Sequence, residues 1–155
     1  MGVKVTGGAS GPAGGALTGT FPNPTFAVDM ATQAELDAKS QLVVFAHVGT
    51  LTVAAGAGQL VFPQAVTIKG VSARAKTAPT GANVIIDVNK NGTTLFTTQG
   101  NRPVIVAAAN QTAAEVTNMD VTAFAAGDYM SVDVDQIGST IAGADLIVTI
   151  RFTLP

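Results

Sequence analysis

The sequence predicts an all-β protein: an antiparallel β-sandwich of jelly-roll type, preceded by an extended Gly/Pro-rich arm and one short helix. Three observations support this fold class. Short runs of alternating apolar and polar residues recur from residue 42 onward, with no helical pattern between them. The dipeptide Asn91-Gly92, a strong hairpin signal, separates two such runs. The preceding chain differs in composition, which divides the protein into an arm (1–29), a helical segment (30–41) and a sandwich (42–155).

Composition limits the possible partners. Charged residues make up 12% of the chain, about half of the ~25% that is usual for a soluble domain. A surface with so little charge is weakly hydrated, so we expect other subunits to cover much of it. The formal net charge is −2 and the basic residues are scattered, so no basic stripe favours nucleic acid.

The composition also disfavours several kinds of chemistry. The chain has no Cys, which excludes disulfides, thiolate metal sites and thiol catalysis. No apolar run approaches the ~20 residues of a membrane span, and the N-terminus does not resemble a secretory signal. We therefore expect neither a membrane partner nor a cofactor.

Residues 1–29 are rich in Gly and Pro and have no periodic apolar pattern. Such a composition is typical of a disordered tail. The alternative is an extended arm that docks onto a neighbouring chain, and apolar residues that a solvated linker does not need favour it. The candidate attachment residues are Leu17, Phe21, Pro22, Pro24, Phe26 and Val28.

A short helix is predicted next, from about Gln33 to Ser40. Thr32 and Glu35 form a capping-box pattern at its start. A helix this short is marginal alone and needs packing partners. Met30 and Leu36 would supply them if three copies of the helix met at a trimer axis.

The remaining chain predicts eight or nine strands, spaced at intervals typical of a sandwich. They are Leu42–Val48, Gln59–Phe62, Val66–Lys76, Asn83–Asn89, Thr93–Thr98, Val104–Ala107, Glu115–Phe124, Tyr129–Ile137 and Asp145–Leu154.

Alternation assigns faces to the strand before the hairpin. Val84, Ile86 and Val88 share one face, which we expect to be buried, and Ile85 and Asp87 share the other. Asn91 and Gly92 then form the type I′ turn, because both central positions of that turn need φ > 0.

Two further strands have informative patterns. The apolar parity of 66–76 reverses at Gly70, which predicts a β-bulge there. The last strand has an unbroken apolar face opposite Thr149, Arg151 and Thr153, which is typical of a central strand. That face consists of Leu146, Val148, Ile150, Phe152 and Leu154.

No residue pattern points firmly to catalysis. His47 is the only His, and alternation places it on the face of Val43 and Phe45, so we interpret it as a core or interface residue rather than the base of a hydrolytic triad. The Gly-rich N-terminal stretch lacks the Lys-Ser/Thr ending of a P-loop.

Three carboxylates offer two interpretations. Asp133 and Asp135 share the outward face of one strand, and Asp87 is expected on a neighbouring strand of the same sheet. They either keep that outer face hydrated or bind a hard cation such as Ca²⁺. With no convincing acid/base pair, the chain is not expected to be an enzyme.

One set of motifs lies between residues 77 and 152. The hairpin DVNKNGTTLF and the later stretch FAAGDYMSVDVDQIGSTIAGADLIVTIRF resemble a β-sandwich module that recurs in bacteriophage structural proteins. The shared pattern is a strand ending in an Asp-Val-Asn-Lys-Asn-Gly hairpin, an Ala-Ala-Gly-Asp turn before a strand of alternating Val and Asp, a Gly-Ser-Thr loop and a final apolar strand.

A second resemblance concerns the arm. GPAGGALTGTFPNPTFA is similar to the Gly-Gly-Asp-Leu-Thr-Gly-Thr-Tyr-Pro-Asn-Pro-Thr segment that precedes trimeric modules in phage fibres. Ala16 replaces the usual Asp and Phe21 the usual Tyr, while Gly19, Pro22 and Pro24 match. The resemblance implies a homotrimeric virion protein with an N-terminal attachment segment.

These resemblances lead to one expected function and one alternative. The first is a homotrimeric capsid decoration or short head-fibre protein on the virion surface, made in the host bacterial cytoplasm and bound to virion proteins such as the major capsid protein. The alternative is a tail-fibre or baseplate tip that binds a host receptor or glycan. The chain has no Trp, one Tyr and seven Phe for stacking on sugars, which disfavours a glycan site.

Overall fold

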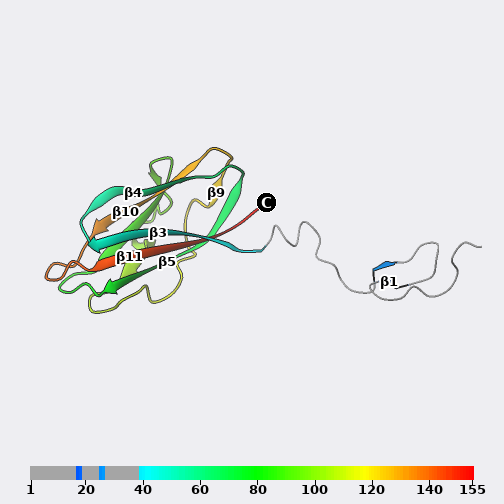
Figure 1. Ribbon diagram of the computed structural model, residues 1–155. Coiled ribbons are helices and arrows are strands. Elements are labelled where there is room, and N and C mark those ends of the chain that lie inside the picture. Colours follow the sequence, from blue (N-terminus) through cyan, green and yellow to red (C-terminus); the bar gives the residue numbers. More distant parts are fainter. Residues whose placement is uncertain (1–16, 19–24, 27–38) are drawn as a thin grey trace, which may run out of the picture. The chain divides into compact units, whose positions relative to one another are not determined.

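The computed structural model describes residues 17–18, 25–26 and 39–155 (Figure 1). The chain divides into two units, Met1–Leu36 and Asp37–Pro155. In the first unit, strands β1 (Leu17–Thr18) and β2 (Thr25–Phe26) pair antiparallel, with Leu17 opposite Phe26. The predicted arm therefore contains a two-stranded ribbon.

Most predictions for the arm and the helix lie outside the described residues. Lys39 and Ser40, the last two residues of the predicted helix, are described and are not helical. Gln41 already belongs to a strand, because it pairs with Phe152 near the end of the chain, so the helical boundary at residue 41 is wrong. The residues that lie outside the described part are Phe21, Pro22, Pro24, Val28, Met30 and Leu36.

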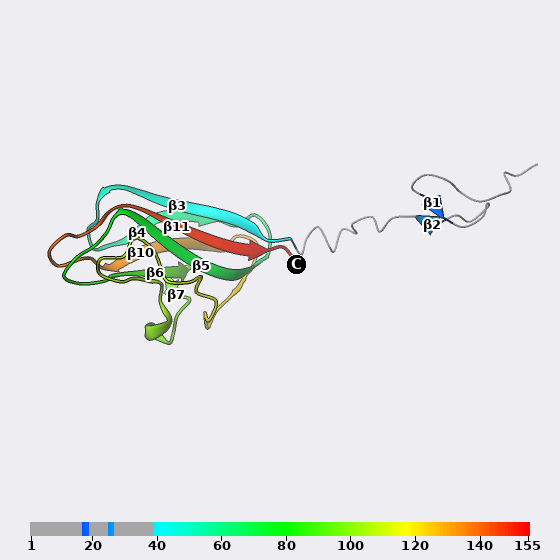
Figure 2. The same cartoon turned by 90° about the horizontal axis from the view of Figure 1, so that it is seen from below.

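The second unit contains two antiparallel sheets (Figures 1 and 2). In one, β10 (Tyr129–Gln136) lies between β4 (Ala54–Val61) and β6 (Val84–Lys90), and β6 also pairs with β7 (Thr93–Thr94) and β8 (Val104–Ile105). In the other, the order is β3 (Gln41–Thr50), β11 (Ala144–Thr153), β5 (Val66–Thr77) and β9 (Ala123–Phe124).

Successive strands from β3 to β6 alternate between the two sheets, and the last strand, β11, lies beside β3. This confirms the predicted all-β, antiparallel class. A jelly roll stays a prediction that the strand order fits. Among the described residues the helical element is the 3₁₀ turn η1 (Gln99–Asn101), and no helix there is long and apolar enough to span a membrane.

One hydrophobic core fills the space between the sheets. Side chains from both inner faces contribute to it, as the alternation predicted: β6 and β11 each place three of theirs in the core, at most 2% exposed. Phe152 and Leu154, predicted to continue this face, are only half-buried because they lie at the open end of the sandwich. The six core residues are Val84, Ile86, Val88, Leu146, Val148 and Ile150.

The predicted bulge in β5 is confirmed. Arg151 of β11 lies opposite Gly70, but the next residue, Phe152, lies opposite Ile68, so Lys69 is the extra residue. The bulge lets Ile68 and Val71 both point into the core.

Three strand predictions differ from the structure by four residues or more at one end. β4 begins at Ala54, five residues before the predicted start, since its Ala- and Gly-rich half pairs with β10 despite having no β-branched residue. β7 ends at Thr94 because the backbone beyond it leaves the sheet: the Leu95 carbonyl oxygen accepts from the amides of Asp120 and Val121, and the Phe96 amide donates to Thr94 Oγ1.

The segment predicted as the strand Glu115–Phe124 is mostly irregular, and only β9 remains at its end. Val116 exchanges two backbone hydrogen bonds with Val71 of β5, yet the amides of Asp120 and Val121 donate to the Leu95 carbonyl oxygen. A segment that bonds to β5 and to the chain beyond β7 cannot form one continuous strand.

Candidate functional site

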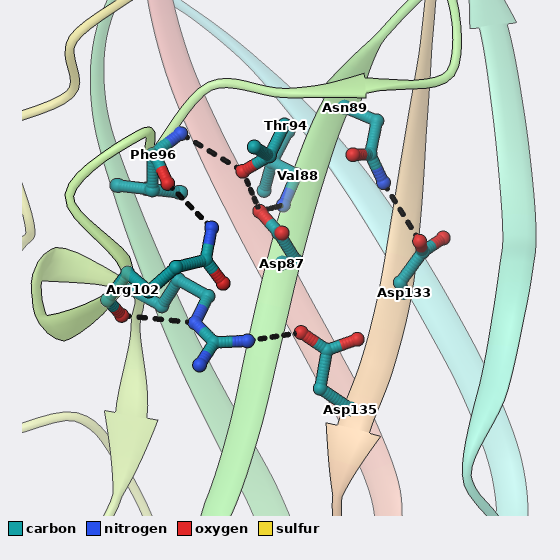
Figure 3. A network of polar contacts seen from close by, with 9 residues as sticks. Asp87, Val88, Asn89, Thr94, Phe96, Arg102, Asp133 and Asp135 are labelled. Carbon is teal, nitrogen blue, oxygen red and sulfur yellow. Dashed lines mark hydrogen bonds and ion pairs between the residues drawn. The ribbon is translucent and has the colours of Figure 1, made fainter.

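The three carboxylates that sequence analysis singled out lie on adjacent strands (Figure 3). Asp87 on β6 is opposite Asp133 on β10 in the strand register. Asp87 is only 7% exposed, so its predicted place on a hydrated outer face is wrong. Its Oδ1 accepts hydrogen bonds from the Val88 amide at 2.7 Å and the Thr94 hydroxyl at 2.8 Å.

The chain between β7 and β8 covers Asp87. The Phe96 amide donates to Thr94 Oγ1 at 2.9 Å, and Gln99 Nε2 donates to the Phe96 carbonyl oxygen at 2.6 Å. Arg102 Nε then donates to the Gln99 carbonyl oxygen at 2.9 Å, and its Nη1 pairs with Asp135 Oδ2 (Figure 3). The role of this covering segment was not predicted: residues 95–98 were expected to continue the strand that begins at Thr93, and β7 ends at Thr94 instead.

Protein donors occupy all three carboxylates. Asp133 accepts hydrogen bonds from the Gly56 amide and from Asn89 Nδ2, the latter at 2.8 Å. Burial raises the pKa of Asp87, while the hydrogen bonds from Thr94 and Val88 oppose that change. Within the described residues no group of three His, Asp or Glu side chains is placed to hold a metal ion. The arrangement thus gives the cation interpretation no support.

Two of the motif elements that carry the phage resemblance are in direct contact. Asn91 and Gly92 have φ of 50° and 80°, as a type I′ turn requires, between the paired residues Lys90 and Thr93. Asn91 Nδ2 donates to Asp128 Oδ1 at 2.7 Å. The hairpin therefore holds the Ala-Ala-Gly-Asp turn at the start of β10.

Further contacts strengthen this junction. The Tyr129 amide donates to Asn91 Oδ1 at 2.9 Å, and Lys90 Nζ lies 3.0 Å from Asp128 Oδ2. The Ala125 amide also donates to Asp128 Oδ2. Hydrogen bonds from Asn91, Ala125 and Lys90 hold the pKa of Asp128 down at about 2.

His47 lies on the half-buried face of β3 with Val43 and Phe45, as alternation predicted. Its Nε2 is 3.4 Å from the Thr50 carbonyl oxygen, a long contact. This environment fits an edge-strand His better than a catalytic base.

The chain that forms one side of the sandwich contains no residue with a formal charge. Residues 41–68 contain no Asp, Glu, Lys or Arg. They include β3 and β4, which are the outermost strands of their two sheets. The strands approach closely: a Cβ built on Gly58 of β4 would lie 2.6 Å from Cδ1 of Phe45 on β3. We call β3, β4 and their connection the neutral side.

Exposed apolar side chains concentrate on the neutral side. Five of the eight large apolar residues that are well exposed in the described chain belong to it, and a sixth, Ile147, pairs with Ala46 of β3. The exposed fraction reaches 86% at Val48. The five are Leu42, Val44, Val48, Val53 and Val61.

A groove of about 290 Å³ opens at the end of the neutral side. Its walls come from β3 and β4, and core aromatic rings form part of its lining: Phe62 packs edge-on against Phe152, with ring centroids 5.6 Å apart. Contributing wall residues include Leu42, Val43, Leu60 and Val61. The lining of the groove is mainly apolar, with Gln41 and Gln64 as its polar side chains.

No protein-family model matches the chain. No curated protein matches it either. Among solved structures, a chain of the cyanophage Pam1 capsid asymmetric unit matches with 20% identity and a TM-score of 0.43, over 76% of this chain and 84% of that one. A match of this size establishes neither a shared fold nor a shared role.

Proposed function

We propose that this chain is a bacteriophage virion structural protein, a homotrimeric capsid decoration or short head-fibre protein attached through its N-terminal arm. The neutral side is the observation that carries the proposal. A surface with exposed Leu and Val and no charge is poorly suited to permanent contact with water. A protein built into a larger assembly buries such a surface.

The motif contacts support the phage assignment independently. The Asn-Lys-Asn-Gly hairpin and the Ala-Ala-Gly-Asp turn are separated in sequence but joined by Asn91 and Asp128. The Gly-Ser-Thr loop also has a structural partner, because the Thr140 amide donates to the Thr80 carbonyl oxygen. Three of the motifs that resemble a virion module are thus each fixed by contacts between distant parts of the chain.

The carboxylate network favours a structural role over catalysis. Asp87, Asp133 and Asp135 each accept hydrogen bonds from the protein, which ties β4, β6, β10 and the covering segment together. A catalytic acid/base pair needs a carboxyl group that is open to substrate. We therefore assign these carboxylates to holding the fold.

The alternative is a tail-fibre or baseplate tip that binds a host receptor or glycan, and a glycan site needs exposed aromatic rings. Phe62, Phe96 and Phe124 are buried, and Tyr129 is half-buried beside the hairpin. Within the described residues, the exposed apolar surface is aliphatic, which suits protein partners better than sugars.

Immunogold labelling of phage particles that carry this gene tests the proposal. We expect gold particles distributed over the capsid. Labelling confined to the tail tip would favour the alternative, and particles without label would contradict a virion role.

A further inference from the structure

We propose that a second copy of this chain covers the neutral side, so that β3 and β4 form the subunit interface. This inference rests on the proposed homotrimeric function and adds the surface through which the copies associate. Three features of the described sandwich support it: its strand edges, its charge distribution and its exposed apolar groups.

The two sides of the sandwich end in strands of very different length. On one side the sheets end in β7 and β9, strands of two residues each. On the neutral side they end in β3, with ten residues, and β4, with eight. Proteins protect free edges with short strands, charges or Pro. β3 and β4 are long and contain neither a charge nor a Pro. Each has a register shift near one end, but the regular part of its outer edge, 41–47 in β3 and 58–61 in β4, is open to a partner.

The charge distribution indicates which kind of partner fits the neutral side. Four ion pairs occur in the described chain, Lys76–Asp145, Lys90–Asp128, Arg102–Asp135 and Arg151–Glu115, and all their members lie outside residues 41–68. Two carboxylates border the neutral side, Asp145 at the Gly49 amide and Asp133 at the Gly56 amide, and each already has a second partner, Lys76 and Asn89 respectively. A partner with a charged surface would therefore lose hydration on the neutral side without gaining an unpaired counter-charge. The complementary partner is itself uncharged and apolar.

A second copy meets this requirement. It offers the same uncharged strands, and their unpaired backbone groups match in length and chemistry. Because the neutral side presents two different edges, β3 of one copy can face β4 of the next. Repetition of that contact in a closed ring covers every long edge, which is compatible with a trimer.

Charge substitution on the neutral side tests the inference. Val44→Lys places an ammonium group within the proposed interface, and Val48→Lys repeats the test at a residue whose 86% exposure makes folding effects small. Val106→Lys is the matched control, because Val106 is 52% exposed against 54% for Val44 but lies outside the neutral side. Circular dichroism and melting curves check that each variant folds.

Sedimentation equilibrium of the full chain supplies the readout. We expect an oligomer for wild type and Val106→Lys, and association weakened on the order of 100-fold or more for Val44→Lys and Val48→Lys. Association of the wild type should also persist in 1 M NaCl, because the Debye length is then ~3 Å and long-range charge effects are screened.

Three results would overturn the inference. One is a wild-type oligomer that both neutral-side variants retain, which would place the interface elsewhere. The second is equal dissociation of all three variants, and the third is a monomeric wild type, which would assign the neutral side to a different protein. Capsid labelling would still test the virion role in each case, so failure of this inference is distinguishable from failure of the proposed function.

Discussion

At the scale of single residues, Asn91 and Asp128 show why a turn motif and a distant tetrapeptide belong together. Asn91 is suited to positive φ, but its side chain also donates to Asp128 and accepts from the Tyr129 amide. Sequence analysis identified the turn from Asn91-Gly92 and did not find this second role. The alternation of β6 and β10 gives no information on which turn lies beside which.

The turn makes one residue-scale prediction. Gly92→Val introduces a β-branched side chain at φ of 80°, a conformation that costs such residues on the order of 1–3 kcal/mol. We expect a lower free energy of unfolding in urea, with Gly100→Val, at a position without nearby atoms or positive φ, as the control. Equal stability of Gly92→Val and wild type would contradict the turn assignment.

Asp128 makes a prediction about acid. Its pKa falls from 3.8 in the unfolded chain to about 2 in the fold, so its contribution to stability is complete above pH 4 and is lost as pH falls toward 2. Asp128→Asn should destabilise the protein at pH 7 and flatten this part of the pH dependence. The check is urea unfolding at pH 7, 4 and 2.5; an unchanged slope between pH 4 and 2.5 would contradict the assignment.

Asp87 changes the pH dependence of stability in the opposite direction. Burial raises its pKa above 3.8, so the folded state binds the proton more tightly than the unfolded state does. Its effect is therefore a loss of stability as pH rises through the raised pKa. The acid dependence of the whole protein combines these two contributions, which is why Asp128 is tested by its own variant.

At the scale of elements, the bulge in β5 couples two strands and a loop. Glu115 binds Arg151 in bidentate geometry, with Oε1–Nε and Oε2–Nη2 distances of 2.9 and 2.7 Å. Arg151 is opposite Gly70 in the register, and a Cβ on Gly70 would lie 2.2 Å from Cδ of Glu115. Gly70 thus provides the space through which the loop reaches β11.

This geometry predicts that substitutions of Gly70 and Glu115 have non-additive effects on stability. Gly70→Ala should displace Glu115 and cost about 1 kcal/mol, the upper range for an exposed ion pair. In a Glu115→Ala background the same change should cost little, because the obstructing carboxyl is gone. A double-mutant cycle in urea measures the coupling, and additive effects would refute it.

The last strand predicts stability losses of different size at two of its residues. Ile150 is fully buried, whereas Phe152 is half-buried at the open end of the core. Ile150→Ala should cost about 2–5 kcal/mol, and Phe152→Ala should cost less than the ~3–5 kcal/mol of a fully buried Phe. Thermal unfolding compares them, with Thr149→Ala on the opposite face as control. A larger loss for Phe152→Ala would mean that a subunit buries its ring.

The elements that sequence analysis predicted well are those with both alternation and β-branched residues. β5, β6, β10 and β11 lie within two residues of their predicted bounds. The predictions for β7 and β9 were too long because β-forming residues also occur where the chain leaves a sheet. Consecutive burial of Leu95 and Phe96, and bonding of 115–124 to two different segments, depend on tertiary packing.

At the scale of the whole molecule, low charge predicted a covered surface but not its location. The uncharged stretch 41–68 is visible in the sequence, yet its meaning depends on β3 and β4 both being outer strands. Strand order comes from long-range pairing, which residue patterns do not encode. The same limit explains why Asp87 was assigned to solvent when a later segment covers it.

The arm makes a prediction for the assembly. Residues 1–29 carry Leu17, Phe21, Phe26 and Val28, each able to contribute about 1.5–3 kcal/mol when buried on a partner. Deletion of residues 1–29 should leave the sandwich folded, because its described core lies between the two sheets of the second unit. It should also leave the trimer, because the proposed interface of β3 and β4 lies outside the deleted segment. We expect the truncated chain to lose attachment to the virion. Circular dichroism and sedimentation equilibrium check its fold and trimeric mass.

Co-sedimentation with phage particles that lack this protein tests attachment most directly. Full-length and truncated chains are added separately to such particles, and the bound protein is quantified in the pellet. The proposed function predicts wild-type occupancy for the full-length chain and loss of binding for the chain without residues 1–29. Failure of the full-length chain to pellet with the particles would contradict the virion role, and wild-type occupancy by the truncated chain would place attachment in the sandwich instead of the arm.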